Sequence, residues 1–209
     1  MTIRHGEKKG KTVSRIMEAA KDEFADKGFA GARVDEIARR AGVNKAALYY
    51  HIGDKDALYA AVIHGVIGMA AQRLAEDVGL TGTPEEKIKT YLRTLIKTFD
   101  ENPQVPRIMM REMASGGKSL PGVFFQDLFS VLQILSGIIE EGKEKGVFAD
   151  TFPLLLHFMA IGTTVIYKTV VPVLLASEYA PDEMKKIGSD ASGAAAREIE
   201  KLILKAIGK

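Results

Sequence analysis

The chain has 209 residues, of which 46% are hydrophobic and 27% are charged, and its formal net charge is +2. This balance is typical of a soluble globular protein with a real core, and the length allows one large domain or a small domain joined to a larger one. The lack of cysteine excludes a disulfide framework and a thiolate metal site, and the four histidines lie too far apart in sequence to suggest a local metal motif.

The N-terminal segment is basic, with five Lys and Arg residues among the first 15 positions. Residues 1–60 carry a net charge of +3, whereas residues 61–209 carry −1. Clustered cations favour nucleic-acid binding through counterion release, although a solvated basic tail has the same composition. Because no apolar stretch follows the basic residues, a signal peptide is not expected and a cytoplasmic location is predicted.

Three helices are predicted in the first quarter of the chain. Residues 12–27 place their apolar side chains on one helical stripe, and Gly28 is a suitable residue to end that helix. Two further short stripes, over 34–41 and 44–51, are separated by Gly42. The periodicity therefore predicts a compact three-helix unit.

Helical periodicity continues to the end of the chain. Asp54 is a suitable N-cap for a fourth helix that reaches about residue 77, and Thr83, followed by Pro84 and two acids, predicts the start of a fifth helix. Further helices are expected at about 104–114, 122–145, 153–176 and 193–207, with a polar loop over 177–192 that can contain a short turn at 182–187. Since no alternating strand pattern is present, the predicted fold class is all-α, with about nine helices.

Residues 34–52 have the pattern of two helices packed around one glycine. Ala38, four residues before Gly42, is small enough for close helix approach, and Gly42 can adopt a positive φ. Asn44 is a good N-cap for the second helix, while Val43 and Leu48 are expected to fill the space between the helices. The pattern predicts a helix-turn-helix motif.

The outward face of the second helix carries side chains that suit DNA. Lys45 can reach a phosphate or a guanine edge, and tyrosine hydroxyls suit phosphate oxygens. Ala46 and Ala47 are small enough to let the helix sit deep in the groove and touch a thymine methyl group. Two adjacent exposed tyrosines, Tyr49 and Tyr50, followed by a histidine would be unusual on a helix that faces only water.

This stretch resembles the TetR family of bacterial regulators. The resemblance is carried in one register by residues 24–29, the run 34–52, Lys55 and the pair Leu58-Tyr59. It implies a helix-turn-helix head over residues 1–56 and a ligand-binding and dimerisation body over 57–209. With the residues discussed above, the predicted DNA-binding set is Arg33, Asn44, Lys45, Ala46, Ala47, Tyr49, Tyr50, His51 and Lys55.

Two positions depart from the family pattern. Arg33 stands where the family commonly has a Ser or Thr that caps the first helix of the motif, and loss of that cap costs about 1 kcal/mol. An additional phosphate contact could accompany the change. Ile52 stands where phenylalanine is usual, which indicates a core substitution.

The segment 153–176 is apolar nearly all round, so a transmembrane helix is one interpretation. His157, Lys168 and Pro172 argue against it, and a helix that is buried on both sides fits better, with no membrane association expected. The resemblance implies a homodimer in which the helices at 153–176 and 193–207 pair with those of a second subunit. Two heads at a fixed spacing would read the half-sites of a near-palindromic double-stranded operator.

The resemblance also implies a cavity for a small-molecule effector between the helices at about 88–145 and 153–176. Apolar, pliable side chains with a few polar groups suit such a site, although the same residues would also form an ordinary core. Their composition suggests a hydrophobic or aromatic ligand. The predicted ligand-binding residues are Met109, Met113, Phe124, Phe129, His157, Phe158, Thr163 and Tyr167.

The function predicted from these features is that of a homodimeric repressor whose operator is released when the effector binds. A helical enzyme is the main alternative, but there is no nucleophile elbow, phosphate loop, metal motif or paired carboxylates. No catalytic residue, metal or cofactor is therefore expected. A pure dimerisation protein would not need the face from Lys45 to His51, whereas an activator, or a regulator without a ligand, is not separated from a repressor by the sequence.

Overall fold

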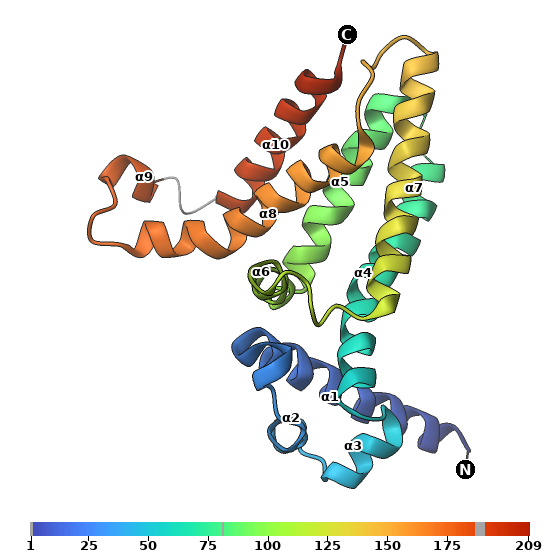
Figure 1. Cartoon of the computed structure of the whole chain (residues 1–209), viewed down its shortest axis with the longest axis vertical. Coiled ribbons are helices and arrows are strands. Elements are labelled where there is room, and N and C mark those ends of the chain that lie inside the picture. The colour runs from blue at the N-terminus through green and yellow to red at the C-terminus, as the bar shows by residue number, and fades with distance from the viewer. Residues whose placement is uncertain (1, 81, 187–190) are drawn as a thin grey trace. The chain divides into compact units, whose positions relative to one another are not determined.

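The computed structural model describes residues 2–80, 82–186 and 191–209, and within them the chain folds into helices without a strand (Figure 1). The all-α prediction is thus confirmed. A short helix lies within the expected loop, where the short turn at 182–187 was predicted, and it begins with two acidic residues directly after Pro181, a favourable helix start. The helices are α1 (Thr2–Gly31), α2 (Val34–Ala41), α3 (Lys45–His51), α4 (Lys55–Gly79), α5 (Pro84–Glu101), α6 (Val105–Ser115), α7 (Gly122–Glu144), α8 (Pro153–Ala176), α9 (Asp182–Lys186) and α10 (Ala191–Ile207).

The chain forms two compact units, each with its own core. The first contains residues 1–69 and 103–127, and the second contains residues 70–102 and 128–209. These units differ from the division after residue 56 that the sequence predicts, because the first half of α4 and the whole of α6 pack with the N-terminal helices. The functional division between a head and a body stays a prediction.

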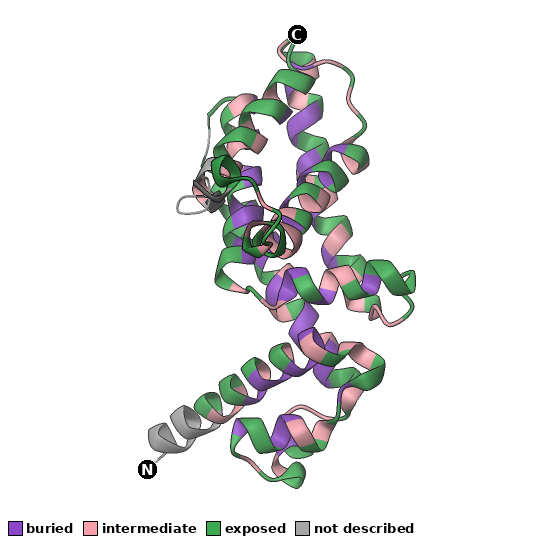
Figure 2. Cartoon of the chain, turned by 90° about the vertical axis from the view of Figure 1, so that its left-hand side faces the viewer, coloured by how far each residue is buried: buried purple, intermediate pink, exposed green. Residues whose placement is uncertain are grey.

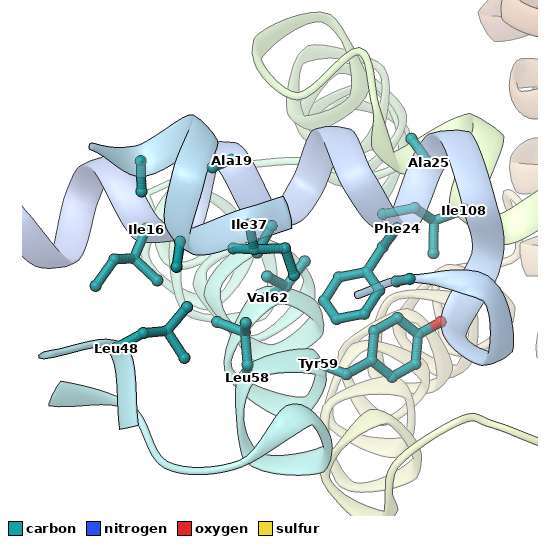
Figure 3. Packing of buried hydrophobic residues seen from close by; sticks show 14 of the residues in the cluster. Ile16, Ala19, Phe24, Ala25, Ile37, Leu48, Leu58, Tyr59, Val62 and Ile108 are labelled. Atoms are coloured by element: carbon teal, nitrogen blue, oxygen red, sulfur yellow. The ribbon is translucent and has the colours of Figure 1, made fainter. Parts of the chain in front are cut away.

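The core of the first unit lies under α1 (Figure 3). Ile16 and Phe24 of α1 are fully buried, because the 3.6-residue repeat places both on one face. The ring of Phe24 meets that of Tyr59 from α4 edge to face, at a centroid distance of 4.7 Å. Burying side chains of this size contributes roughly 1.5–3 kcal/mol each. Gly28, with φ 69° and ψ 173°, interrupts α1 at the predicted position.

The second unit has a core built from α4, α5, α7, α8 and α10. Its helices show alternating buried and exposed residues (Figure 2). The start of α5 is fixed by the predicted Thr83 cap, since Thr83 and Glu86 form a reciprocal capping box. Phe148 is 1% exposed and lies so close to Gly142 that a Cβ there would be 2.0 Å from its ring. Only glycine therefore leaves room for this aromatic residue.

Three helices, α4, α7 and α8, are long and apolar enough to cross a membrane by length and composition alone. In α8, however, the polar side chains have partners within the second unit. Lys168 forms an ion pair with Asp100 of α5, and His157 makes a hydrogen bond with Tyr91 of α5. Through these contacts, one side of α8 packs against α5.

Candidate nucleic-acid interface

The junction between α2 and α3 has the geometry that the sequence predicts. Gly42 adopts a left-handed conformation with φ 63° and ψ 39°, which a residue with a side chain rarely adopts. The backbone N–H of Val43 donates to the carbonyl of Ala38 at 3.0 Å and closes the end of α2. Ala38 is 3% exposed and belongs to the first core, where its small side chain allows close packing.

The helix α3 is held at its start and at its centre. The side chain of Asn44 accepts a hydrogen bond from the backbone N–H of Ala47 at 2.7 Å, as a predicted N-cap should. Leu48 is fully buried in the first core. Because only Leu48 anchors the helix from its inner side and Asn44 acts at its first turn, the outer side is left to solvent.

The outer side of α3 exposes most of the side chains predicted to contact DNA. Tyr50 is 80% exposed and Tyr49 is 44% exposed, and Lys45 and Ala46 are also exposed. Ala47 is only half-buried, so it is less available than Ala46. The structure therefore brings together a basic, aromatic and polar surface on one short helix.

His51 differs from its neighbours because it is partly buried. Its ring lies 5.2 Å from that of Tyr50, and its Nδ1 atom is buried without a hydrogen-bond partner in the described part of the chain. A buried polar atom that lacks a partner is costly. A direct DNA contact by His51 stays a prediction.

Lys45 has a partner in the head itself. Its ammonium nitrogen lies 2.8 Å from Oδ1 of Asp35 in the first turn of α2, and this hydrogen bond raises the pKa of Lys45. Both side chains are exposed, so the pair contributes little to stability and can be exchanged for a phosphate contact. Asp35 thus orients the ammonium group without holding it tightly.

Lys55 and Arg33 make contacts that the sequence did not reveal. The ammonium group of Lys55 donates to the carbonyl of Ala30 at 3.2 Å and lies 4.8 Å from the ring centre of Phe29. Lys55 therefore contacts the last residues of α1, beyond the interruption at Gly28, and its predicted DNA contact is untested. Arg33 lacks a side-chain cap, as predicted, but its backbone N–H donates to Oε1 of Glu23 at 3.3 Å.

Glu23 is a buried acidic residue beside the motif that the sequence interpretation missed. Its carboxylate is 2% exposed and lies on the buried face of α1, next to Phe24. Glu23 Oε2 lies 3.2 Å from a guanidinium nitrogen of Arg40, which compensates its charge although the geometry is not that of a hydrogen bond. A signal was present, since Glu23 follows Ala20 by three residues and thus falls on the apolar stripe.

Comparison with known proteins agrees with this geometry. Residues 16–62 match the family model of Bacterial regulatory proteins, tetR family. The HTH-type transcriptional regulator RutR of Escherichia coli K12 is 31% identical over 160 residues, which cover 75% of this chain and 74% of that protein. The chain belongs to the TetR family. The HTH-type transcriptional repressor SCO4008 of Streptomyces coelicolor is 30% identical over 143 residues, covering 68% of this chain and 70% of that protein.

Solved structures show the same TetR-family fold. The transcriptional regulator FadR from Bacillus subtilis, in complex with stearoyl-CoA, has a TM-score of 0.70 at 21% identity and covers 92% of this chain and 97% of its own. KstR2 of Mycobacterium tuberculosis, a ketosteroid transcriptional regulator, has a TM-score of 0.69 at 19% identity, with coverage of 100% and 97%. The chain is accordingly a DNA-binding transcriptional regulator and not an enzyme.

The predicted ligand-binding residues of this TetR-family protein belong to both compact units. In the first unit, Met109 and Phe124 pack against the core, whereas Met113 is 56% exposed. In the second unit His157 is buried, Tyr167 is half-buried, and the exposed residues are Phe129, Phe158 and Thr163. A cleft beside Tyr167 has a volume of about 10 Å³, about the space of one water molecule, and the predicted ligand contact of Tyr167 stays a prediction.

The buried polar pair of the second unit joins α5 to α8. The hydroxyl oxygen of Tyr91 lies 2.5 Å from Nδ1 of His157, and both side chains are at most 5% exposed. Burial lowers the pKa of His157 to about 4 and raises the pKa of Tyr91. The imidazole is therefore neutral at pH 7, and the tyrosine O–H donates to it.

The free energy of unfolding is expected to fall in acid because of His157. Its pKa of about 4 in the folded state lies below the ordinary histidine value of 6.5, so the unfolded chain binds the proton first. The contribution is complete above pH 6.5 and is lost as the pH falls to 4, by about 3 kcal/mol. Urea unfolding of the wild type and of His157→Gln between pH 4.5 and 7 gives the free energy of unfolding of each protein, and the difference in their pH dependence is the contribution of His157. If the free energy of unfolding falls equally with pH in both proteins, His157 is not the cause of the acid sensitivity.

Proposed function

We propose that this regulator is a cytoplasmic homodimeric repressor that holds a palindromic operator and releases it when a small hydrophobic or aromatic effector binds. The observation that carries the proposal is the exposed face of α3, where Lys45, Tyr49 and Tyr50 stand outward on a helix that is capped and anchored from behind. Side chains on a rigid support can make directional contacts with base edges and phosphates.

The shape of α3 supports insertion into the major groove. The groove is about 12 Å wide and admits one helix. Ala46 is exposed and small, so the helix can approach the bases closely. The surrounding long side chains, Lys45 and the two tyrosines, can then reach the backbone on either side. Arg33, Asn44, Ala47, His51 and Lys55 complete the proposed contact set.

The outer face of α8 supports the dimer. Four exposed apolar side chains follow one another along this helix, at spacings of 4, 7 and 7 residues: Leu155, Met159, Ile166 and Val173 are between 49% and 69% exposed. A repeat of 3.5 residues is typical of a helix that packs along a second helix. Gly162 lies on the same stripe, and the space where its Cβ would stand is open. Leu202 adds a further exposed apolar residue, from α10.

The repressor mode and the effector are supported by the comparisons. The relatives include the named repressors SCO4008 and NicS, and the B. subtilis FadR structure contains stearoyl-CoA. This chain has exposed apolar side chains of the kind that such ligands bind, including Met113, Phe129 and Phe158. The effector must bind the DNA-free conformation more tightly than the DNA-bound one, since otherwise no release follows.

Selection of bound sequences from a random duplex DNA pool tests the proposal. A two-fold symmetric consensus with half-sites about one helical turn apart is the expected result. The recovered operator is then titrated with stearoyl-CoA and with aromatic acids as probes, and release by one of them supports the effector. A pool without enrichment would overturn the DNA-reading function, and a single non-repeated half-site would overturn the dimer.

A further inference from the structure

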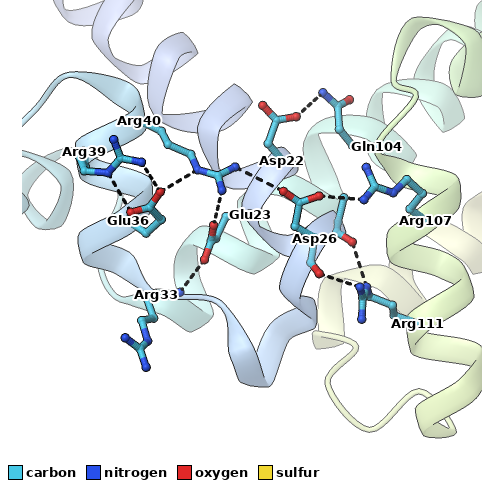
Figure 4. A network of polar contacts seen from close by, with 11 residues as sticks. Asp22, Glu23, Asp26, Arg33, Glu36, Arg39, Arg40, Gln104, Arg107 and Arg111 are labelled. Atoms are coloured by element: carbon cyan, nitrogen blue, oxygen red, sulfur yellow. Dashed lines mark hydrogen bonds and ion pairs between the residues drawn. The ribbon is translucent and has the colours of Figure 1, made fainter.

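A cluster of ion pairs in the first unit joins α6 to α1 and α1 to α2 (Figure 4). Asp26 of α1 lies at its centre. Its Oδ1 accepts a hydrogen bond from Nη2 of Arg107 on α6 at 2.8 Å, and its Oδ2 lies 3.5 Å from Nη1 of Arg40 on α2. One carboxylate is thus shared by arginines from two helices, one inside the helix-turn-helix motif and one outside it.

On the α6 side, the contact is made at the point where α1 is interrupted. Arg111 donates to the carbonyl of Ala25 at 2.9 Å and to that of Asp26 at 2.6 Å. These carbonyls lie just before Gly28, in the last turn of the regular helix, where backbone acceptors lack helical partners. A basic side chain is favoured there. Gln104, the residue directly before α6, adds a hydrogen bond to Asp22 at 2.8 Å.

On the α2 side, Arg40 is held by three carboxylates. Besides Asp26, its guanidinium lies 3.2 Å from Oε2 of Glu23 and 3.1 Å from Oε1 of Glu36. Glu23 in turn accepts the backbone N–H of Arg33, the residue at which α2 begins. Hydrogen bonds from Arg39 and Arg40 lower the pKa of Glu36 to about 2. The position of α2 on α1 is thus set by charged groups at both of its ends.

We propose that Asp26 and Arg107 are positioning residues for DNA reading, which place α2, and with it α3, through the chain Arg107–Asp26–Arg40. Without the Arg107 guanidinium, Asp26 has Arg40 as its counter-ion and draws it from Glu23 and Glu36. The placement of α2 then changes, and operator affinity falls. Arg107 lies outside residues 16–62, the segment matched by the family model. The inference rests on the proposed function, since it assigns DNA reading to α3.

Neutralising Asp26 distinguishes positioning from simple charge attraction. Asp26→Asn makes the head more positive, so counterion release alone predicts tighter binding to any DNA. The proposal predicts the opposite for the operator: about tenfold weaker binding, equivalent to 1.4 kcal/mol, with affinity for random duplex unchanged or raised. Glu18→Gln is the matched control, because it removes the same charge from α1 at an exposed residue that pairs with Lys21 on the same helix. It should not weaken operator binding.

Two further measurements complete the test. Arg107→Gln should weaken operator binding as Asp26→Asn does, Arg107→Lys should restore part of the loss, and the double variant should lose no more than either single one. Hydrogen exchange without DNA should show faster exchange of α2 and α3 amides in Asp26→Asn than in Glu18→Gln.

The results separate this inference from the proposed function. Operator binding by Asp26→Asn and Arg107→Gln that is as tight as by Glu18→Gln would overturn the inference, and so would unchanged exchange in α2 and α3. If Asp26→Asn lowers the melting temperature, the operator affinity of Arg107→Gln decides the inference instead. The Arg107 side chain is 54% exposed, so its replacement is expected to leave the fold intact. A wild-type chain that selects no DNA sequence would instead refute the proposed function, while the exchange result would still decide whether Asp26 holds α2 and α3 in place.

Discussion

Replacement of both Lys45 and Tyr49 by alanine should abolish specific operator binding and leave a folded dimer. Each contact to a base or a phosphate is worth roughly 1–3 kcal/mol, so loss of two weakens binding by about thirtyfold or more. Folding should be preserved, because both side chains are exposed and neither belongs to the first core. Fluorescence anisotropy with the selected operator gives the affinity, and sedimentation gives the oligomeric state.

A matched control exists outside the head. Lys145 and Tyr179 are also exposed, and both lie in the second unit. The variant Lys145→Ala with Tyr179→Ala removes the same two side-chain types and the same charge, and it should bind the operator like the wild type. Wild-type operator affinity in the Lys45 and Tyr49 double variant would refute the assignment of α3 as the reading helix.

Introduction of a charge on the outer face of α8 should dissociate the dimer. Ile166 is 52% exposed in the single chain and lies in the middle of the apolar stripe. In a two-fold symmetric interface, Ile166→Glu places two unpaired carboxylates in an apolar contact, and each costs several kcal/mol. The dimer dissociation constant should rise by about a thousandfold or more.

Sedimentation equilibrium measures this change, and operator affinity at nanomolar protein should fall with it, because one head reads only one half-site. Leu80→Glu is the control, since Leu80 is 89% exposed and lies at the end of α4, away from the α8 stripe in sequence. A stable Ile166→Glu dimer with wild-type affinity would show that α8 is not the interface.

The helix-turn-helix motif could be predicted because its determinants are local. The left-handed turn at Gly42, the Asn44 cap and the burial of Leu48 depend on neighbours within about two helical turns, so residue type and spacing suffice. The same applies to the capping box at Thr83 and to the interruption of α1 at Gly28. All of these were predicted from the sequence.

The contacts that position the motif could not be predicted in this way. Arg107 and Arg111 lie more than 80 residues from their partners in α1, and on their own helix they look like ordinary solvated arginines. Lys55 has the residue type and spacing of a DNA contact, yet the structure places its ammonium group against Ala30 and Phe29. Partner choice for a long charged side chain depends on which helices meet.

The sequence by itself determined the class of this protein and predicted the helix face that is proposed to read DNA, since helix caps, glycine turns and apolar spacing act within a few residues. Only the tertiary structure decided that Glu23 is buried against Arg40, that α6 packs with the N-terminal helices, and that His157 faces Tyr91. The physical reason is that a buried charge or polar group needs a partner, and packing of distant segments supplies that partner.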